Sequence, residues 1–165
     1  MIVGIDQSYT STGVVCLTDD GHRILGSGIF STGFGMTPAG LKHIVRQIGG
    51  YVVGMAHLQE TYEQPCMIFI EGNSVAHSNS KSARGLAELA GALKYVLAKY
   101  NPRDVPISSW KSKIAKNQLR GIKKHTKAGE IKYLEIIAEI TGNYFATTDE
   151  ADAYCIAEYG RRYML

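Results

Sequence analysis

Four acidic residues stand where a carboxylate can do chemistry. Asp6 directly follows the apolar run MIVGI, and Glu71 directly follows the apolar run MIFI. Asp149 and Asp152 lie three residues apart at the start of an expected helix, so both side chains point to the same side of it. Carboxylate oxygens are the ligands that Mg²⁺ prefers, and the sequence has neither HExxH nor a zinc-type spacing of Cys and His. The four acids therefore predict a site for a hard divalent cation.

The helix that carries Asp152 indicates that this carboxylate faces the protein. Its side of the helix continues through Ile156 and Tyr159, which form an apolar stripe. A buried carboxylate costs free energy unless it gains a metal, a cation or a proton. Helix geometry turns Glu150 about 100° away from Asp149, so we do not expect Glu150 to be a ligand.

Each acid also has a purely structural interpretation. Asp149 can cap its helix after the two threonines that precede it, while Asp6 and Glu71 can accept hydrogen bonds from the backbone where their strands end. Two of these acids end buried strands, and this combination favours a shared site over separate structural roles. Beside a surface that binds phosphate, such a site would catalyse metal-assisted hydrolysis of a phosphodiester bond.

The net charge of +3 hides a strong clustering of the basic residues. Residues 103–132 contain 9 Lys or Arg and 2 Asp or Glu, whereas residues 133–165 contain 2 Lys or Arg and 6 Asp or Glu. A solvated helix face usually mixes the two signs, so the cluster indicates a polyanion, most commonly the phosphate backbone of nucleic acid. A basic surface loop without a partner is the alternative. The residues expected to bind phosphate are Lys111, Lys113, Lys116, Arg120, Lys123 and Lys124.

The length of 165 residues and the hydrophobic content of 45% are those of one globular domain with a buried core. Strands are expected at residues 2–7, 13–18, 23–31, 67–70 and 105–107, and helices at 38–60, 80–100, 131–138 and 149–163. A hairpin meander followed by strands that alternate with helices predicts a mixed α/β sheet. The three cysteines are expected to be free thiols. Because the sequence shows no signal-peptide pattern and no membrane-length apolar stretch, we expect a cytoplasmic protein.

Three motifs, in this order, resemble the RuvC-type Holliday junction resolvases of the RNase H-like superfamily. They are GIDQSYTSTG (residues 4–13), FIEG (69–72) and DEADAYCIA (149–157). Each motif alone is weak, but the ordered set spans nearly the whole chain. The resemblance implies a single RNase H-like nuclease domain over residues 1–165. Its mixed five-stranded α/β sheet would have three antiparallel strands followed by two parallel strands and would be flanked by helices.

The resemblance also implies a site, a reaction and a partner. The family's four acidic metal ligands match Asp6, Glu71, Asp149 and Asp152. They would hold two Mg²⁺ ions, for which Mn²⁺ would substitute. Lys127 falls where the family has a lysine near the active site, and Lys111 resembles a position that contacts DNA. A homodimer formed through the helix at 80–100 would nick opposing strands of a four-way DNA junction and leave 5′-phosphate and 3′-hydroxyl ends.

The sequence departs from the family pattern in two places. The loop at residues 72–77 contains no Phe or Tyr, although bacterial members often carry there an aromatic residue that stacks on bases. His77 is the candidate for this stacking role and is counted among the DNA-binding residues. The turn QSYTSTG replaces the more usual Pro-Gly after the first aspartate. Both departures are typical of divergent relatives, such as viral or organellar ones.

Three other functions stay open at this point. A nuclease of the same fold that acts on RNA–DNA hybrids, flaps or structured RNA would use the same acids, because these define the chemistry and not the substrate. A DNA-binding protein without catalysis would use the acids structurally. An actin-like nucleotide-binding module also begins with an Ile-Asp strand, but it needs a second glycine-rich phosphate loop, which this sequence lacks.

Overall fold

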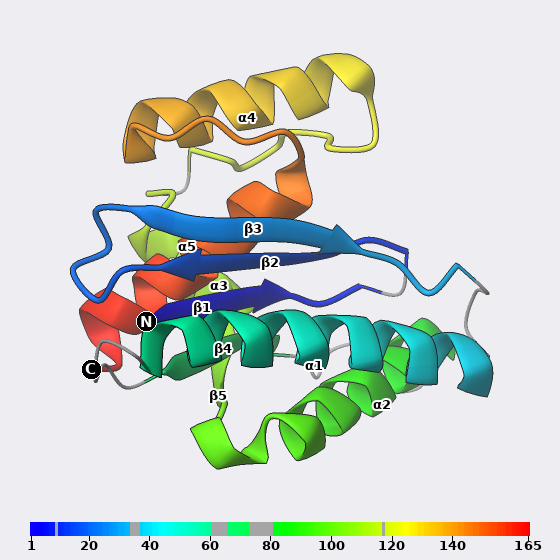
Figure 1. Cartoon of the computed structure of the whole chain (residues 1–165). Helices are drawn as coiled ribbons and strands as arrows, with labels where there is room; N and C mark the ends of the chain where they lie inside the picture. The colour runs from blue at the N-terminus through cyan, green and yellow to red at the C-terminus, as the bar shows by residue number, and fades with distance from the viewer. Residues whose placement is uncertain (9, 34–36, 61–65, 73–80, 117) are drawn as a thin grey trace.

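A five-stranded sheet with helices on both faces forms the fold (Figure 1). The computed structural model describes the chain except for residues 9, 34–36, 61–65, 73–80 and 117. The strands are β1 (Ile2–Asp6), β2 (Thr12–Leu17), β3 (Ile24–Phe30), β4 (Met67–Gly72) and β5 (Arg103–Pro106). The helices are α1 (Pro38–Glu60), α2 (Lys81–Val96), the 3₁₀ helix η2 (Ala98–Tyr100), α3 (Ile107–Lys113), α4 (Lys127–Thr141) and α5 (Thr148–Tyr163). None of the helices in the described part of the chain is both long and apolar enough to cross a membrane.

The strand order is β3-β2-β1-β4-β5. β1 pairs antiparallel with β2 and parallel with β4, and β2 and β4 pair in turn with β3 (antiparallel) and β5 (parallel). The predicted mixed sheet, antiparallel first and parallel afterwards, is confirmed. Because β1, β3, β4 and β5 run in the same direction, all four end at one edge of the sheet. In the register, Asp6 is paired with Gly13, and the preceding Ile5 is paired with Ile70.

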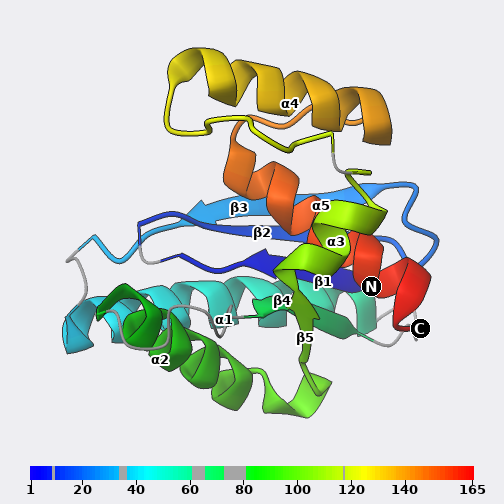
Figure 2. The same cartoon turned by 180° about the vertical axis from the view of Figure 1, so that it is seen from behind.

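Two hydrophobic cores lie on the two faces of the sheet. Because side chains alternate along a strand, Val3 and Ile5 pack with Ile44 and the rest of the α1–α2 core, whereas Ile2 belongs to the core with α3, α4 and α5. Figures 1 and 2 show these two groups of helices on opposite sides of the sheet. Asp6 lies four residues after Ile2 on the same strand, so its side chain lies on the same face of the sheet, the one covered by α5.

Two glycines allow α5 to lie directly on the sheet. A Cβ atom at Gly4 would come 2.0 Å from the backbone oxygen of Ala153, and one at Gly13 would come 2.1 Å from the backbone oxygen of Asp149. Real Cβ atoms never approach a carbonyl so closely, so any side chain at either position would push the helix away. The close packing brings the first turns of α5 over the end of β1.

The region after β4 differs from the sequence prediction. The strand expected at 105–107 is β5, which ends at Pro106, and Ile107 already belongs to α3. The helix α3 was not predicted. It forms because proline lacks the N–H that would continue the ladder, and because Trp110 is completely buried among residues of α5 and β4. The helix expected at 80–100 is shorter, since α2 ends at Val96 and a 3₁₀ turn follows.

The close packing of α5 predicts the effect of one added methyl group. Gly4→Ala should lower the free energy of unfolding by about 1–3 kcal/mol or more, because its Cβ meets helix backbone that cannot move locally. Gly54→Ala is the matched control, since an exposed helical glycine with open space around it should become more stable by about 0.5–1 kcal/mol. Urea unfolding measures both. Equal midpoints for Gly4→Ala and the parent would contradict the role given to Gly4.

Candidate functional site

Three of the four predicted acids meet at the end of the parallel strands. Asp6 ends β1 and Glu71 lies near the end of β4, and these strands run side by side in the same direction. Asp152 lies in the second turn of α5, which Gly4 brings onto β1. Asp6 is 9% exposed and Asp152 is 4% exposed. The fold therefore buries several carboxylates at one point of the sheet edge.

The carboxylates of this acidic cluster act on one another. Burial raises the pKa of Asp6 well above its usual value, and the charges of Asp152 and Glu71 raise it further. Burial also raises the pKa of Glu71 and of Asp152. Raised values mean that the ionised form of each group is poorly solvated, and that Asp6 and Glu71 are also repelled by neighbouring carboxylates. A cation placed in the cluster would relieve both effects.

Asp152 is held by two partners from the segment before α4 and from α4 itself. The Lys124 ammonium forms an ion pair with one of its oxygens, and the Tyr133 hydroxyl donates a hydrogen bond to the other. The Lys124 ammonium also lies 4.2 Å from the centre of the Tyr133 ring. In the described chain Lys124 thus supplies a positive charge to the cluster, and it lowers the pKa of Asp152.

A tight turn positions Lys124. The Thr126 hydroxyl caps α4 by accepting a hydrogen bond from the N–H of Gly129, and it donates one to the carbonyl of Lys123. A Cβ atom at Gly129 would lie 2.1 Å from that same carbonyl, so only glycine lets the turn pack under the helix. The sequence predicted Lys124 only as a phosphate-binding residue. The glycine two residues after Lys127 is the signal that could have indicated a fixed turn there.

Glu71 also has partners that the sequence did not reveal. The indole N–H of Trp110 donates a hydrogen bond of 3.1 Å to the Glu71 carboxylate. The Gln7 amide donates one of 2.8 Å to the Glu71 backbone carbonyl. Trp110 was missed because it lies on the unpredicted helix α3, although a lone tryptophan ahead of a basic segment is a recognisable signal. These contacts fix the orientation of the second acid.

Asp149 lies beside the cluster rather than inside it. Its charge contributes to the raised pKa of Asp6, after burial and the charges of Asp152 and Glu71. The cap of α5 is Thr147, whose side chain accepts a hydrogen bond of 3.2 Å from the N–H of Glu150, so the interpretation of Asp149 as the cap is wrong. Glu150 accepts a hydrogen bond of 2.5 Å from the hydroxyl of Ser27, a residue of β3.

A cleft of about 310 Å³ opens beside the acidic cluster, and we call it the basic cleft. Its lining residues are Lys111, Leu119, Arg120, Ile122, Lys124 and Tyr133. Lys124 and Tyr133 belong to both the cleft and the contacts of Asp152, so the two features adjoin. Three of the basic residues predicted to bind phosphate therefore lie next to the acids.

The remaining predicted residues lie outside this arrangement. Exposed positions are taken by Lys113, Lys116, Lys123 and Lys127. Lys127 is the first residue of α4, and none of the contacts among the described residues joins it to the acids. Lys124, three residues earlier, takes the position beside the acids instead. His77 lies outside the described residues.

The donor atoms of the cluster fit Mg²⁺ by their chemistry. Asp6, Glu71 and Asp152 offer only hard oxygen ligands, and their mutual repulsion favours a bound cation. Within the described residues, no three His, Cys, Asp or Glu side chains converge as ligands of one ion. Both oxygens of Asp152 already have partners, the Lys124 ammonium and the Tyr133 hydroxyl. Metal binding would require Asp152 to exchange the lysine for the ion.

The raised pKa of Asp6 predicts how the stability depends on pH. The folded chain keeps a proton that the unfolded chain releases above about pH 3.9, so stability falls as the pH rises through the folded pKa. Asp6→Asn cannot ionise and should melt at a higher temperature than the parent at pH 7 in chelator. The increase should be about 2–4 °C for each kcal/mol by which the substitution lowers the cost of a buried negative charge.

The difference should vanish as the pH falls below 4, where the parent carboxyl is also neutral in both states. Glu135→Gln, which removes an exposed acid of α4, is the control and should change the stability by less than about 0.5 kcal/mol. A lower melting temperature for Asp6→Asn at pH 7 would contradict the repulsion described above.

Comparison with known proteins links this geometry to one fold. No family model matches the sequence, and no curated protein is significantly similar to it. Among solved structures, Thermus thermophilus RuvC matches with a TM-score of 0.61 and 19% identity over 98% of this chain and 96% of that one. T. thermophilus RuvC in complex with a Holliday junction substrate matches with the same TM-score and coverage at 18% identity. The chain therefore has the fold of RuvC, as the motifs predicted.

Proposed function

We propose that this chain is a Mg²⁺-dependent endonuclease that cleaves four-way DNA junctions. The observation that carries the proposal is the acidic cluster of Asp6, Glu71 and Asp152 beside the basic cleft, on the fold of RuvC. Clustered acids attract divalent cations and the cleft attracts phosphate, so a phosphodiester fits both halves of the site. A RuvC structure with this fold is described as a complex with a Holliday junction substrate, which supports branched DNA as the substrate.

In this proposal the acids hold the metal and do not react themselves. The ligands of two Mg²⁺ ions would be Asp6, Glu71, Asp149 and Asp152. When bound, Mg²⁺ supplies activation of the attacking water and stabilisation of the charge on the leaving 3′ oxygen. Tyr133 would keep Asp152 in place through its hydroxyl, and Trp110 would do the same for Glu71 through its indole N–H.

The basic residues would act on the phosphate. Lys124 would turn from Asp152 to the oxygens of the scissile phosphate and neutralise the charge that develops there during attack. Lys111 and Arg120 line the same cleft and would bind phosphates on either side of the scissile one. The ammonium of Lys124 would therefore compensate the acids before the metal binds and the substrate afterwards.

Paired cleavage of a junction requires two sites. We propose a homodimer formed through α2, whose exposed side includes Tyr95 and Val96, 85% and 45% exposed. Large apolar side chains at such exposure are common at contacts between subunits. The two copies would nick opposing strands and leave 5′-phosphate and 3′-hydroxyl ends.

Cleavage assays test the reaction and the substrate together. The parent should cut a labelled four-way junction with Mg²⁺ and not with chelator, whereas Glu71→Gln and Asp152→Asn should lose at least about 10²-fold in rate because metal ligation fails. A linear duplex and an RNA–DNA hybrid of the same sequence are the controls for substrate choice. Preferred cleavage of the hybrid would favour the alternative nuclease, and undiminished cleavage by both variants would exclude catalysis by these acids.

A second pair of variants tests which lysine serves the reaction. Lys124→Gln should lower kcat by about 10²-fold, because the charge beside the phosphate is lost. Lys127→Gln removes the same charge from an exposed position three residues away and should mainly weaken DNA binding. Single-turnover cleavage of the junction separates the two effects. A larger loss of kcat in Lys127→Gln would instead assign the role to Lys127, as the family resemblance implies.

A further inference from the structure

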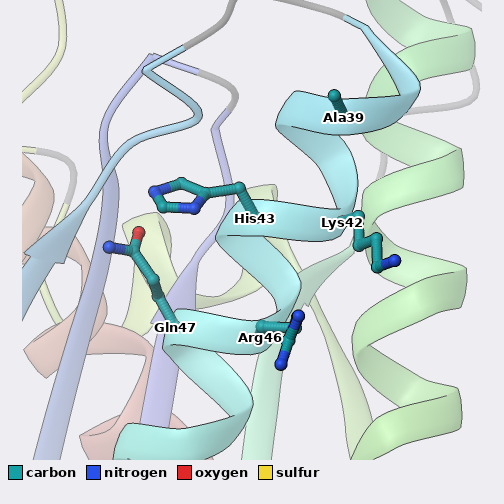
Figure 3. A pocket seen from close by; sticks show the side chains of 5 residues that line it. All are labelled: Ala39, Lys42, His43, Arg46 and Gln47. Carbon is teal, nitrogen blue, oxygen red and sulfur yellow. The ribbon is translucent and has the colours of Figure 1, made fainter.

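The helix α1 carries a second basic surface, far along the chain from the basic cleft. Lys42, His43 and Arg46 are exposed and, with Ala39 and Gln47, line a shallow hollow of about 430 Å³. Figure 3 shows Lys42 on the side of the helix toward α2 and His43 and Gln47 on the other side. We call Lys42, His43 and Arg46 the α1 basic surface.

The charge of this surface is not balanced. The sequence of α1 contains no Asp or Glu before its last residue, Glu60. Some cations elsewhere in the described chain are paired with carboxylates, as Lys94 is with Asp104 and Arg161 with Glu158. Within the described part of the chain, neither Lys42 nor Arg46 forms such a pair. A solvated helix face usually carries both signs, so an anionic ligand is indicated.

The surface lies at the same edge of the sheet as the acidic cluster but on the opposite face. Phe30, the last residue of β3, is paired with Thr12, and the neighbouring Gly13 is paired with Asp6, so β3 and β1 end at the same edge of the sheet. The next helix along the chain, α1, begins at this edge (Figure 1). The basic cleft belongs to the face covered by α3, α4 and α5 (Figure 2).

We propose that the α1 basic surface binds the phosphate backbone of a second duplex arm of the branched DNA whose scissile strand lies at the acidic cluster. A straight duplex presents its phosphates to one face of the protein, whereas a branched molecule sends another arm around the edge to the opposite face. Lys42 and Arg46 are four residues apart and adjacent on the helix surface, so they contact one strand together. This inference rests on the proposed function and adds the part of the substrate that the second surface holds.

Binding without divalent cations tests the surface separately from cleavage. Fluorescence anisotropy would compare the parent with Lys42→Gln/Arg46→Gln on a four-way junction and on a linear duplex that joins two of its arms. The double variant should bind the junction at least about tenfold more weakly, and the slope of log K against log salt should fall by about 2, for two lost phosphate contacts. Its affinity for the duplex should stay within about twofold of the parent.

The matched control is Arg23→Gln/Lys99→Gln. It removes two exposed cations that precede β3 and β5, and therefore lie at the edge of the sheet opposite the acids. Circular dichroism and thermal unfolding would show that both double variants keep the fold. The control should bind the junction and the duplex as the parent does, because its charges lie away from both basic surfaces.

The outcomes separate this proposal from the proposed function. Junction affinity and salt slope equal to those of the control would overturn the α1 basic surface, whatever the nuclease activity. An equal loss for junction and duplex would overturn the assignment to a second arm. A parent that binds branched DNA through α1 but cuts none with Mg²⁺ would overturn only the nuclease. A parent that binds neither DNA would overturn both.

Discussion

The site depends on one close contact, that of α5 with the first two strands. Gly4 and Gly13 have no side chains, so the backbone of α5 lies directly on β1 and β2. This contact places Asp152 next to the carboxylate that ends β1, and it buries both acids. Any larger residue at either glycine would separate the helix from the sheet. The arrangement of the acids is thus a consequence of backbone packing, and the two glycines are as much a part of the site as the carboxylates.

The same contact has an energetic cost that the chain compensates locally. Burial raises the pKa of Asp6, Glu71 and Asp152, because the ionised form of each carboxylate is poorly solvated there. Lys124 offsets part of this cost with a positive charge. A structural role alone would be served better by apolar residues. Buried acids of this kind suit the metal site that we propose, and the ion pair of Lys124 with Asp152 offsets part of their charge.

The molecule has two basic surfaces, one on each face of the sheet. The basic cleft lies beside the acids, and the α1 basic surface lies across the sheet from them. The first belongs to a segment whose sequence is conspicuously basic, whereas the second comes from a region with no net charge between residues 1 and 102. Only the fold shows that Lys42 and Arg46 stand at the same edge as the acids, because the intervening chain runs the length of β2 and β3 first.

The sequence by itself determined the sheet and the identity of the acids. Apolar runs that end in Asp6 and Glu71 define buried strands, and helical spacing puts Asp149 and Asp152 on one side of a helix, because these signals are local. Tertiary structure decided what touches the acids. Trp110, Tyr133 and Lys124 reach them from segments 39, 19 and 28 residues away from their partners, and no local pattern encodes such distances. A side chain that acts through a long-range contact has no periodicity to reveal it, so its partner becomes visible only when the chain is folded.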